Sequence, residues 1–351
     1  MDALLRYSLY QIAFSLVVFE IYLMLFCCVV IIITKLITRW SQNRRISRQA
    51  QIGKIIETSL FDQKPIDTLK IPRKLLDFRN LVESLEKFDQ LFSDPRWVEI
   101  KEHILKKYML PKVKAEASSR FWFRRQLAAR CLLLSPNHAD PHLLNKLLDD
   151  SRYLVRVSAA VCITQAHHKE LFYKVIHKMS QETELSRFPY RDALIQVDEE
   201  KYRWIEELLK KETNKEVIAI CLDILSARYS GNLLPLVKPF VNDPDANCRK
   251  LAIKALGNIP SLEAIQLLMD HLNDPDWNIR AEAIVGLQKL YAVQAIPKLR
   301  SLLNDPVWWV RLQAGLTLKG FGKTGLEVLA TQSKELPKAY EIAQYTLAMP
   351  S

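Results

Sequence analysis

The pattern of apolar and polar positions repeats every 31 residues from residue 119 to residue 335, through seven units without a change of register. The marker column is Arg in six of the units, at Arg125, Arg156, Arg187, Ile218, Arg249, Arg280 and Arg311. Three residues later stand Ala128, Ala159, Tyr190, Cys221, Ala252, Ala283 and Ala314, and seven residues later stand Leu132, Ile163, Leu194, Leu225, Leu256, Leu287 and Leu318. A period of this length indicates a solenoid, in which each unit buries its apolar face against its neighbours.

Each unit is predicted to form a helix, a short turn and a second helix. The most regular turns are Asp243–Arg249, Asp274–Arg280 and Asp305–Arg311, and each begins with Asp-Pro. We expect the Asp to cap the second helix and the Pro to occupy its first position. A second Pro column, at Pro111, Pro235 and Pro297, marks the expected start of the first helix.

The Asp and the Arg of a unit stand six residues apart. The pairs are Asp150 and Arg156, Asp243 and Arg249, Asp274 and Arg280, and Asp305 and Arg311, while the acid column weakens to Ser119, Gln181 and Glu212 elsewhere. An Arg fork can hold a carboxylate or a carbonyl of the neighbouring turn, so the same bond would repeat along the stack. We therefore interpret these residues as a structural ladder and not as catalytic pairs.

The motif D-P-x-x-x-[VI]-R-x-x-A-x-x-x-L resembles the HEAT repeat, in the short form also seen in phycobilin lyases. The resemblance covers roughly 60% of the chain and is strongest in the last three units. It weakens where Pro189 falls inside a second helix and where Ile218 replaces the Arg, and we expect a kink at Pro189. The resemblance implies an all-α fold, a right-handed α-α superhelix of about seven helix-turn-helix units.

Residues 7–34 carry a single formal charge, Glu20, and are long enough to cross a bilayer core. Asp2 and Arg6 precede this segment, and Lys35, Arg39, Arg44, Arg45 and Arg48 follow it. Positive flanks stay in the cytoplasm, so we predict an uncleaved single-pass anchor with its N-terminus outside and the solenoid in the cytoplasm. A buried hydrophobic helix is the alternative. Glu20 either pairs with a partner's transmembrane helix, or is protonated, or lies at a shallower depth.

The predicted domains are an anchor (1–36), a basic juxtamembrane segment with a helical N-terminal cap (37–118), and the solenoid with its C-terminal cap (119–351). Residues 37–136 hold 21 Lys and Arg against 11 Asp and Glu, whereas residues 137–351 hold 27 against 26. Nearly all of the net charge of +11 is therefore close to the membrane, where it suits anionic lipid head groups. A nucleic-acid ligand would need a basic face along the repeats, so none is expected.

Two columns are candidates for partner binding. Just before the second helix stand Trp122, Tyr153, Glu184, Lys215, Ala246, Trp277 and Trp308, with Trp309 beside the last. Exposed aromatic residues are frequent anchors at interfaces, although aromatic packing between turns is the alternative. The second column, Arg130, Val161, Asp192, Asp223, Lys254, Val285 and Leu316, is expected to line the concave face. Its mixed character suits a protein better than a phosphate.

The sequence offers little chemistry. Cys131, Cys162, Cys221 and Cys248 fall in the apolar columns, and no metal-ligand cluster, phosphate-binding loop or nucleophile–base motif is present. We expect no cofactor and no enzyme activity; a phycobilin lyase-like or DNA glycosylase-like enzyme is the alternative. The working hypothesis is a membrane-anchored scaffold that binds a protein at the same membrane. The architecture is similar to bacterial membrane HEAT proteins that accompany membrane glycosyltransferases, which implies such an enzyme as partner.

Overall fold

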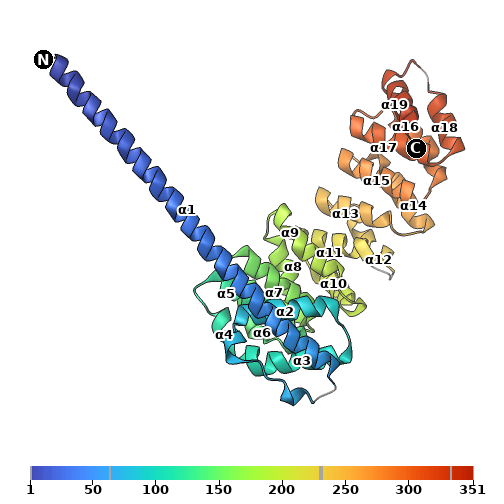
Figure 1. Cartoon of the computed structure of the whole chain (residues 1–351). Helices are drawn as coiled ribbons and strands as arrows, with labels where there is room; N and C mark the ends of the chain where they lie inside the picture. Colours follow the sequence, from blue (N-terminus) through green and yellow to red (C-terminus); the bar gives the residue numbers. More distant parts are fainter. Residues whose placement is uncertain (1, 63–64, 229–231, 333, 351) are drawn as a thin grey trace. The chain divides into compact units, whose positions relative to one another are not determined.

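The computed structural model describes residues 2–62, 65–228, 232–332 and 334–350, with side chains described from residue 18 onward. Every regular element in these ranges is helical, so the chain is all-α as predicted (Figure 1). It forms two compact units, residues 1–135 and 136–351. The division falls inside the first predicted repeat, and the three-domain division made from the sequence stays a prediction.

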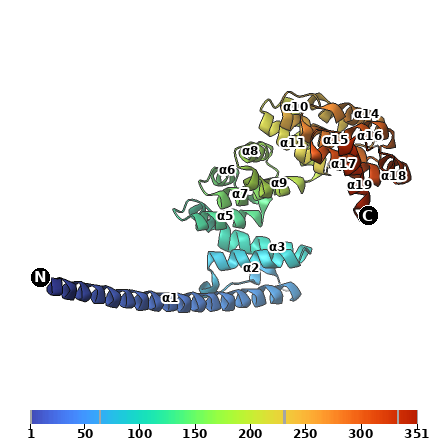
Figure 2. The ribbon, with the colours of Figure 1, turned by 90° about the horizontal axis from the view of Figure 1, so that it is seen from above.

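The first unit is built around one long helix. Its helices are α1 (Asp2–Phe61), α2 (Phe78–Leu91), α3 (Pro95–Ile104), α4 (Leu110–Ala117) and α5 (Trp122–Leu133), with short helical turns at Ile66–Thr68, Arg73–Leu75 and Leu105–Met109. The C-terminal part of α1 packs on α2 and α3, and its N-terminal part extends beyond them (Figure 2). Ile52 and Ile56 are fully buried in this packing, which explains why the helix continues so far past its apolar stretch.

From residue 18 onward, the apolar stretch of α1 has no protein cover. Large side chains from Phe19 to Trp40 are exposed, and none of the apolar window within Val18–Phe61 is buried. The core helix of a soluble protein would be mostly buried, so this helix does not match that alternative. By length and composition it is able to cross a membrane.

One helix start in the first unit is determined by a local cap. Asp94 is the N-cap of α3, where its side chain accepts a hydrogen bond from the amide of Trp97 at 3.0 Å, and Pro95 follows it. Trp97 and Ile100 are fully buried behind this cap. A local cap and an apolar face together account for the helix, as the sequence indicated.

The second unit is a stack of helix pairs. Its helices are α6 (Pro141–Leu148), α7 (Tyr153–Gln165), α8 (Lys169–Ser180), α9 (Glu184–Ile195), α10 (Glu199–Lys211), α11 (Lys215–Arg228), α12 (Leu234–Val237), α13 (Ala246–Leu256), α14 (Leu262–Asp270), α15 (Trp277–Lys289), α16 (Ile296–Leu302), α17 (Trp308–Gly320), α18 (Lys323–Ala330) and α19 (Pro337–Ala348). Turns of 3-10 helix lie at Pro136–His138, Lys238–Phe240, His271–Asn273 and Val293–Ala295. The second helices contact one another in chain order, from α7 through α9, α11, α13, α15 and α17 to α19.

The repeat columns form the core of the stack. Every residue three positions after the marker column is fully buried, and so is the Leu or Ile seven positions after it, apart from the nearly buried Leu132. The first of these columns is mostly Ala because the second helices approach closely. At the end of α13 the approach is closer still, since a Cβ on Gly257 would meet the Cα of Gly286 at 2.7 Å. The four cysteines of the apolar columns are buried as predicted.

One local prediction was wrong. The Asp of Asp-Pro does not cap the second helix, which begins three residues later, and the Pro does not occupy the first position of that helix. Asp245 caps α13 by accepting from the amide of Cys248, and Asp276 caps α15 by accepting from the amide of Asn278. Asp243 and Asp274 instead accept hydrogen bonds from backbone amides within the turn itself, and they form part of the Asp–Arg ladder. The Pro column at the first helices is confirmed, as is Pro189 inside α9.

The stack continues one helix past the predicted repeats, so that α18 and α19 form a last pair. The predicted closing cap from residue 336 contains α19, which packs on α17 and α18 in the way that α17 packs on α15 and α16. Leu336-Pro337 stands 31 residues after Asp305-Pro306, so the register also continues. In this last pair, however, a Leu occupies the position of the ladder Asp.

Candidate functional site

The Asp and Arg columns meet in the turns between helices. The Nη1 of Arg280 donates to the carbonyl oxygens of Asp274 and Pro275, at 2.8 and 3.2 Å, within its own turn. Its Nε and Nη2 donate to the two carboxylate oxygens of Asp305 in the next turn, at 2.8 and 2.9 Å. Both side chains are buried, at 8% and 7% exposure. One guanidinium therefore links two consecutive units by a bidentate, charge-assisted pair.

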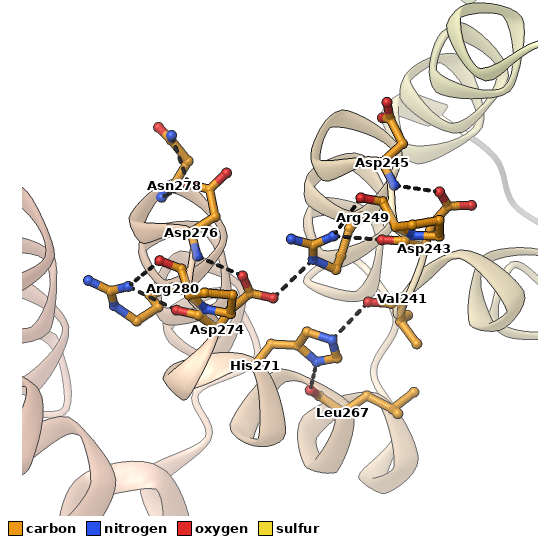
Figure 3. Close-up of polar contacts among 12 residues, drawn as sticks. Val241, Asp243, Asp245, Arg249, Leu267, His271, Asp274, Asp276, Asn278 and Arg280 are labelled. Carbon is orange, nitrogen blue, oxygen red and sulfur yellow. Dashed lines mark hydrogen bonds and ion pairs between the residues drawn. The ribbon is translucent and has the colours of Figure 1, made fainter.

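The preceding rung, formed by Arg249 and Asp274, is similar but joins the two side chains through a single hydrogen bond (Figure 3). The Nη1 of Arg249 donates to the carbonyl oxygen of Asp243 at 2.6 Å, and its Nε donates to Oδ2 of Asp274 at 3.0 Å. The other oxygen of Asp274 accepts from the amide of Asp276 at 2.9 Å. In Asp243, Asp274 and Asp305, Oδ1 accepts from a backbone amide of the same turn and Oδ2 accepts from a cation of the previous turn, which explains why the carboxylate is not free to cap the helix.

Irregular units keep the ladder with other residues. Arg156 donates to the carbonyl oxygen of Asp150 at 2.9 Å and through Nε to Glu182 at 2.7 Å, so Glu182 supplies the carboxylate that the column position Gln181 lacks. Where Ile218 replaces the Arg, the Nζ of Lys215 reaches Oδ2 of Asp243 at 2.6 Å. Sequence reasoning missed both, although each charged residue lies within three positions of its column.

A buried histidine adds a second link between units. His271 is 7% exposed, and its two ring nitrogens lie 2.8 Å from the carbonyl oxygens of Leu267 and Val241 (Figure 3). Val241 belongs to the preceding unit, so the ring bridges the end of α14 to the turn before α13. No sequence signal distinguished this His from the others, because its partners are backbone atoms.

The column of residues just before the second helices contains aromatic side chains that are partly exposed and partly packed against other rings. Trp122 in the first unit, and Trp277, Trp308 and Trp309 in the second, are between 38% and 49% exposed. The rings of Trp308 and Trp309 lie 6.3 Å apart, and Tyr345 of α19 meets Trp308 edge-on at 6.4 Å. Sequence reasoning missed Tyr345 because it is outside the repeat columns. The structure thus brings together an aromatic cluster at the C-terminal turns.

Tyr153 behaves differently from the tryptophans. Its hydroxyl donates to the carbonyl oxygen of Ser186 at 2.9 Å, and its ring lies 6.5 Å from that of Tyr190. These contacts join successive units, as in the packing alternative. Tyr153 is therefore less available to a partner than the tryptophans.

The charged residues of the second candidate column largely satisfy one another. Asp223 accepts hydrogen bonds from Arg191 and, at 2.9 Å, from Lys254. Burial acts to raise the pKa of Asp223, but these hydrogen bonds outweigh it and hold the pKa below its ordinary value of 3.8. Asp192 is exposed. A partner on this face would meet a neutralised cluster in place of free charges.

Two hollows lie near these features. In the second unit, a pocket of about 350 Å³ is lined by Trp308, Arg311, Lys338, Glu341, Ile342 and Tyr345. In the first unit, a cavity of about 540 Å³ lies between α1 and residues 65–75, and Lys54, Lys70, Lys74 and Arg96 are among its lining residues. The 350 Å³ pocket coincides with the aromatic cluster, and the 540 Å³ cavity adds to the basic character of residues 37–118.

Nothing in the described part of the chain resembles a reactive centre. Burial raises the pKa of the Cys162 and Cys248 thiols to about 12 and raises that of Cys221 further, so these thiols stay protonated at neutral pH. Among the described residues no His, Cys, Asp and Glu side chains are grouped as metal ligands. The features that remain are a surface and a pocket suited to binding.

Comparison with known proteins identifies the repeats. The model of HEAT repeats matches residues 202–275, 233–319 and 269–332, which include the three most regular units. No curated protein sequence matches the chain.

Solved structures are similar to the chain at low identity. The karyopherin Kap121p bound to the SUMO protease Ulp1p aligns with a TM-score of 0.53 and 12% identity, over 84% of this chain and 41% of the karyopherin. Kap121p bound to RanGTP gives 0.45 and 13%, over 85% and 49%. The Escherichia coli protein YibA gives 0.38 and 15%, over 74% and 98%. The chain therefore spans less than half of the karyopherin.

The ladder leads to a prediction on stability. Arg280→Ala removes four hydrogen bonds and leaves the carboxylate of Asp305 buried without its cation. We expect a loss of roughly 3 kcal/mol in the free energy of unfolding of the detergent-solubilised chain, measured by chemical denaturation. Arg300→Ala, an exposed Arg on α16, is the control and should change it by less than about 0.5 kcal/mol. Equal effects would show that the rung does not hold the turns together.

The Asp223 cluster leads to a prediction on pH dependence. Because the pKa of Asp223 is lower in the folded chain than its ordinary value of 3.8, its stabilisation is present above that pH and lost as pH falls through the folded value. Asp223→Asn should lower the melting temperature at pH 7 and flatten its decline between about pH 5 and pH 2. Asp192→Asn, an exposed Asp on the same face, is the control. An unchanged acid profile in Asp223→Asn would contradict the ion-paired state.

Proposed function

The chain carries HEAT repeats, and we propose that it is a membrane-anchored scaffold whose repeats bind a protein partner at the same membrane. HEAT solenoids usually serve as non-enzymatic scaffolds, since stacked units present a long surface and place their polar groups in structural bonds. The observation that carries the proposal is the exposed aromatic cluster of Trp308, Trp309 and Tyr345 at the rim of a pocket.

The aromatic cluster has the composition of an interface centre. Trp and Tyr are enriched among residues that contribute most to binding, and they do so beside pockets that exclude water. Trp277, Trp308 and Trp309 are therefore the proposed contact residues. The exposed Asp192, three units before Trp277 in the stack, is a separate proposed contact. Trp122 is a proposed contact of the first unit. Tyr153, Asp223 and Lys254 rank below them because their polar groups are bonded within the chain.

The structural likeness supports binding in general terms. The karyopherin with the same fold was solved bound to a SUMO protease, so that solenoid binds a protein. Fold alone does not determine a partner. The resemblance to bacterial membrane HEAT proteins makes a membrane glycosyltransferase the partner class that we propose first.

The N-terminal helix supports anchoring. The apolar side chains of α1 are exposed along a stretch long enough to span a bilayer, and the basic residues Lys35, Arg39, Arg44, Arg45 and Arg48 follow. We propose that this flank is cytoplasmic and interacts with anionic lipids, and that Glu20 pairs with a partner's transmembrane helix. Tethering both proteins to one membrane raises their effective concentration, so a modest interface suffices.

Partner capture tests the scaffold. The affinity-tagged full chain should retain a stoichiometric protein from solubilised membranes, and Trp308→Ala and Trp309→Ala should each reduce that yield about tenfold or more. Leu262→Ala, at an exposed position on α14, is the control. Circular dichroism and melting temperature must stay near wild type in all variants. A wild-type chain that retains no protein above an untagged control would contradict the proposal.

Topology is tested separately. In intact cells, a protease added outside should leave the repeats uncut, because we place them in the cytoplasm. The same protease should digest them once the membrane is permeabilised. Digestion of the repeats in intact cells would overturn the orientation, and recovery of the full chain in the soluble fraction would overturn the anchor.

A further inference from the structure

The ladder ends with an unpaired arginine. Arg249 and Arg280 each donate Nε to the Asp that stands 25 residues later, Asp274 and Asp305. For Arg311 the corresponding position is Leu336, which has no acceptor in its side chain. The Nη1 of Arg311 still donates to the carbonyl oxygen of Asp305 at 2.7 Å.

The Nε of Arg311 is buried without a hydrogen-bond partner among the described residues. Buried donors in folded proteins are almost always paired, and an exception points to a missing ligand or to strain. Here Nη1 is held as in the earlier rungs, with a second contact to the carbonyl oxygen of Pro306 at 3.1 Å. The donor is thus fixed in place, and only its acceptor is lacking.

Arg311 faces an open pocket. The pocket of about 350 Å³ lies between two helices. It is lined by Trp308 and Arg311 of α17 and by Lys338, Glu341, Ile342 and Tyr345 of α19. Arg311 and Lys338 supply positive charge, and the two rings with Ile342 supply apolar walls. Glu341 lines the same space, yet it is not bonded to the Nε of Arg311.

We propose that this pocket binds the carboxylate side chain of an Asp or Glu in the partner protein, with a neighbouring apolar side chain against Trp308 and Tyr345. The proposal rests on the scaffold function and names the chemistry of its partner. The chain's own rungs show which group fits, since each earlier Nε donates to a carboxylate on the turn that follows. A partner's acidic loop would complete the ladder where Leu336 leaves it open.

A carboxylate explains the site better than a small inorganic anion. The planar guanidinium of an Arg can donate to both oxygens of one carboxylate. The ammonium group of a Lys lacks this planar arrangement of donors. A free anion would leave the rings of Trp308 and Tyr345, the latter 51% exposed, without contact. A peptide fills both parts of the pocket at once.

Peptide binding to the detergent-solubilised full chain tests the proposal. The probe is a capped, fluorescently labelled peptide copying residues 302–309, Leu-Leu-Asn-Asp-Pro-Val-Trp-Trp, which presents a ladder Asp beside aromatic residues. We expect it to bind at least about tenfold more tightly than the same peptide with Asn for the Asp, which is the discrimination of one charge-assisted pair. Arg311→Gln and Arg311→Lys should both remove this difference, and Arg300→Gln should keep it.

Three further results decide the identity of the ligand. Equal binding of the Asp and Asn peptides, or equal competition by inorganic phosphate, would overturn a carboxylate site. Tight binding of the Asn peptide with a free C-terminus would overturn the assignment to a side chain. Leu336→Asp should give Arg311 a carboxylate partner within the chain. This variant should therefore have a higher melting temperature and should not bind the Asp peptide. Unchanged binding in that variant would overturn the proposal.

Partner capture separates this inference from the scaffold. If the wild-type chain retains its partner and Arg311→Gln retains it equally well, the carboxylate site is wrong while the scaffold stands. If the wild-type chain retains no partner, the scaffold fails whatever the peptide does. Loss of capture in Arg311→Gln with a melting temperature near wild type supports both.

Discussion

The pairing of an Arg in one turn with an Asp in the next is the interaction on which the repeat architecture depends. Each second helix offers its neighbour a narrow column of Ala, and such small side chains allow close packing without specifying the register of the stack. The guanidinium of Arg280 supplies that register, because its bonds to Asp274 and Asp305 join two turns in one geometry. Buried and fully bonded, the pair would be costly to break.

This constraint also determines where the repeats can bind. A ladder residue whose hydrogen bonds are made within the stack has nothing to offer a partner, and the same holds for Asp223 and Lys254. The contacts that we propose for a partner lie where the pattern stops: at Trp308 and Tyr345 of the aromatic cluster, and at Arg311, the last Arg of the ladder. The function proposed for the chain follows from these incomplete positions.

The 31-residue period alone predicted the helix pairs and the buried columns, because small or apolar residues recur at the same positions of every unit. It failed for the starts of the second helices, since an Asp can cap a helix or fold a turn, and the choice depends on the Arg of another unit. Glu182 and Lys215 were missed because long side chains reach a rung from neighbouring positions. The exposed tryptophans were found by their column, whereas the unpaired Nε of Arg311 is visible only in three dimensions.

A double-mutant cycle on Arg280 and Asp305 tests the central claim most directly. The two single variants, Arg280→Met and Asp305→Asn, and the double variant would be unfolded with denaturant as full chains in detergent. If the pair holds consecutive turns together, the double variant should be less destabilised than the sum of the singles by at least about 1 kcal/mol. Additive effects, within about 0.5 kcal/mol, would show that the two side chains act independently and would contradict the account.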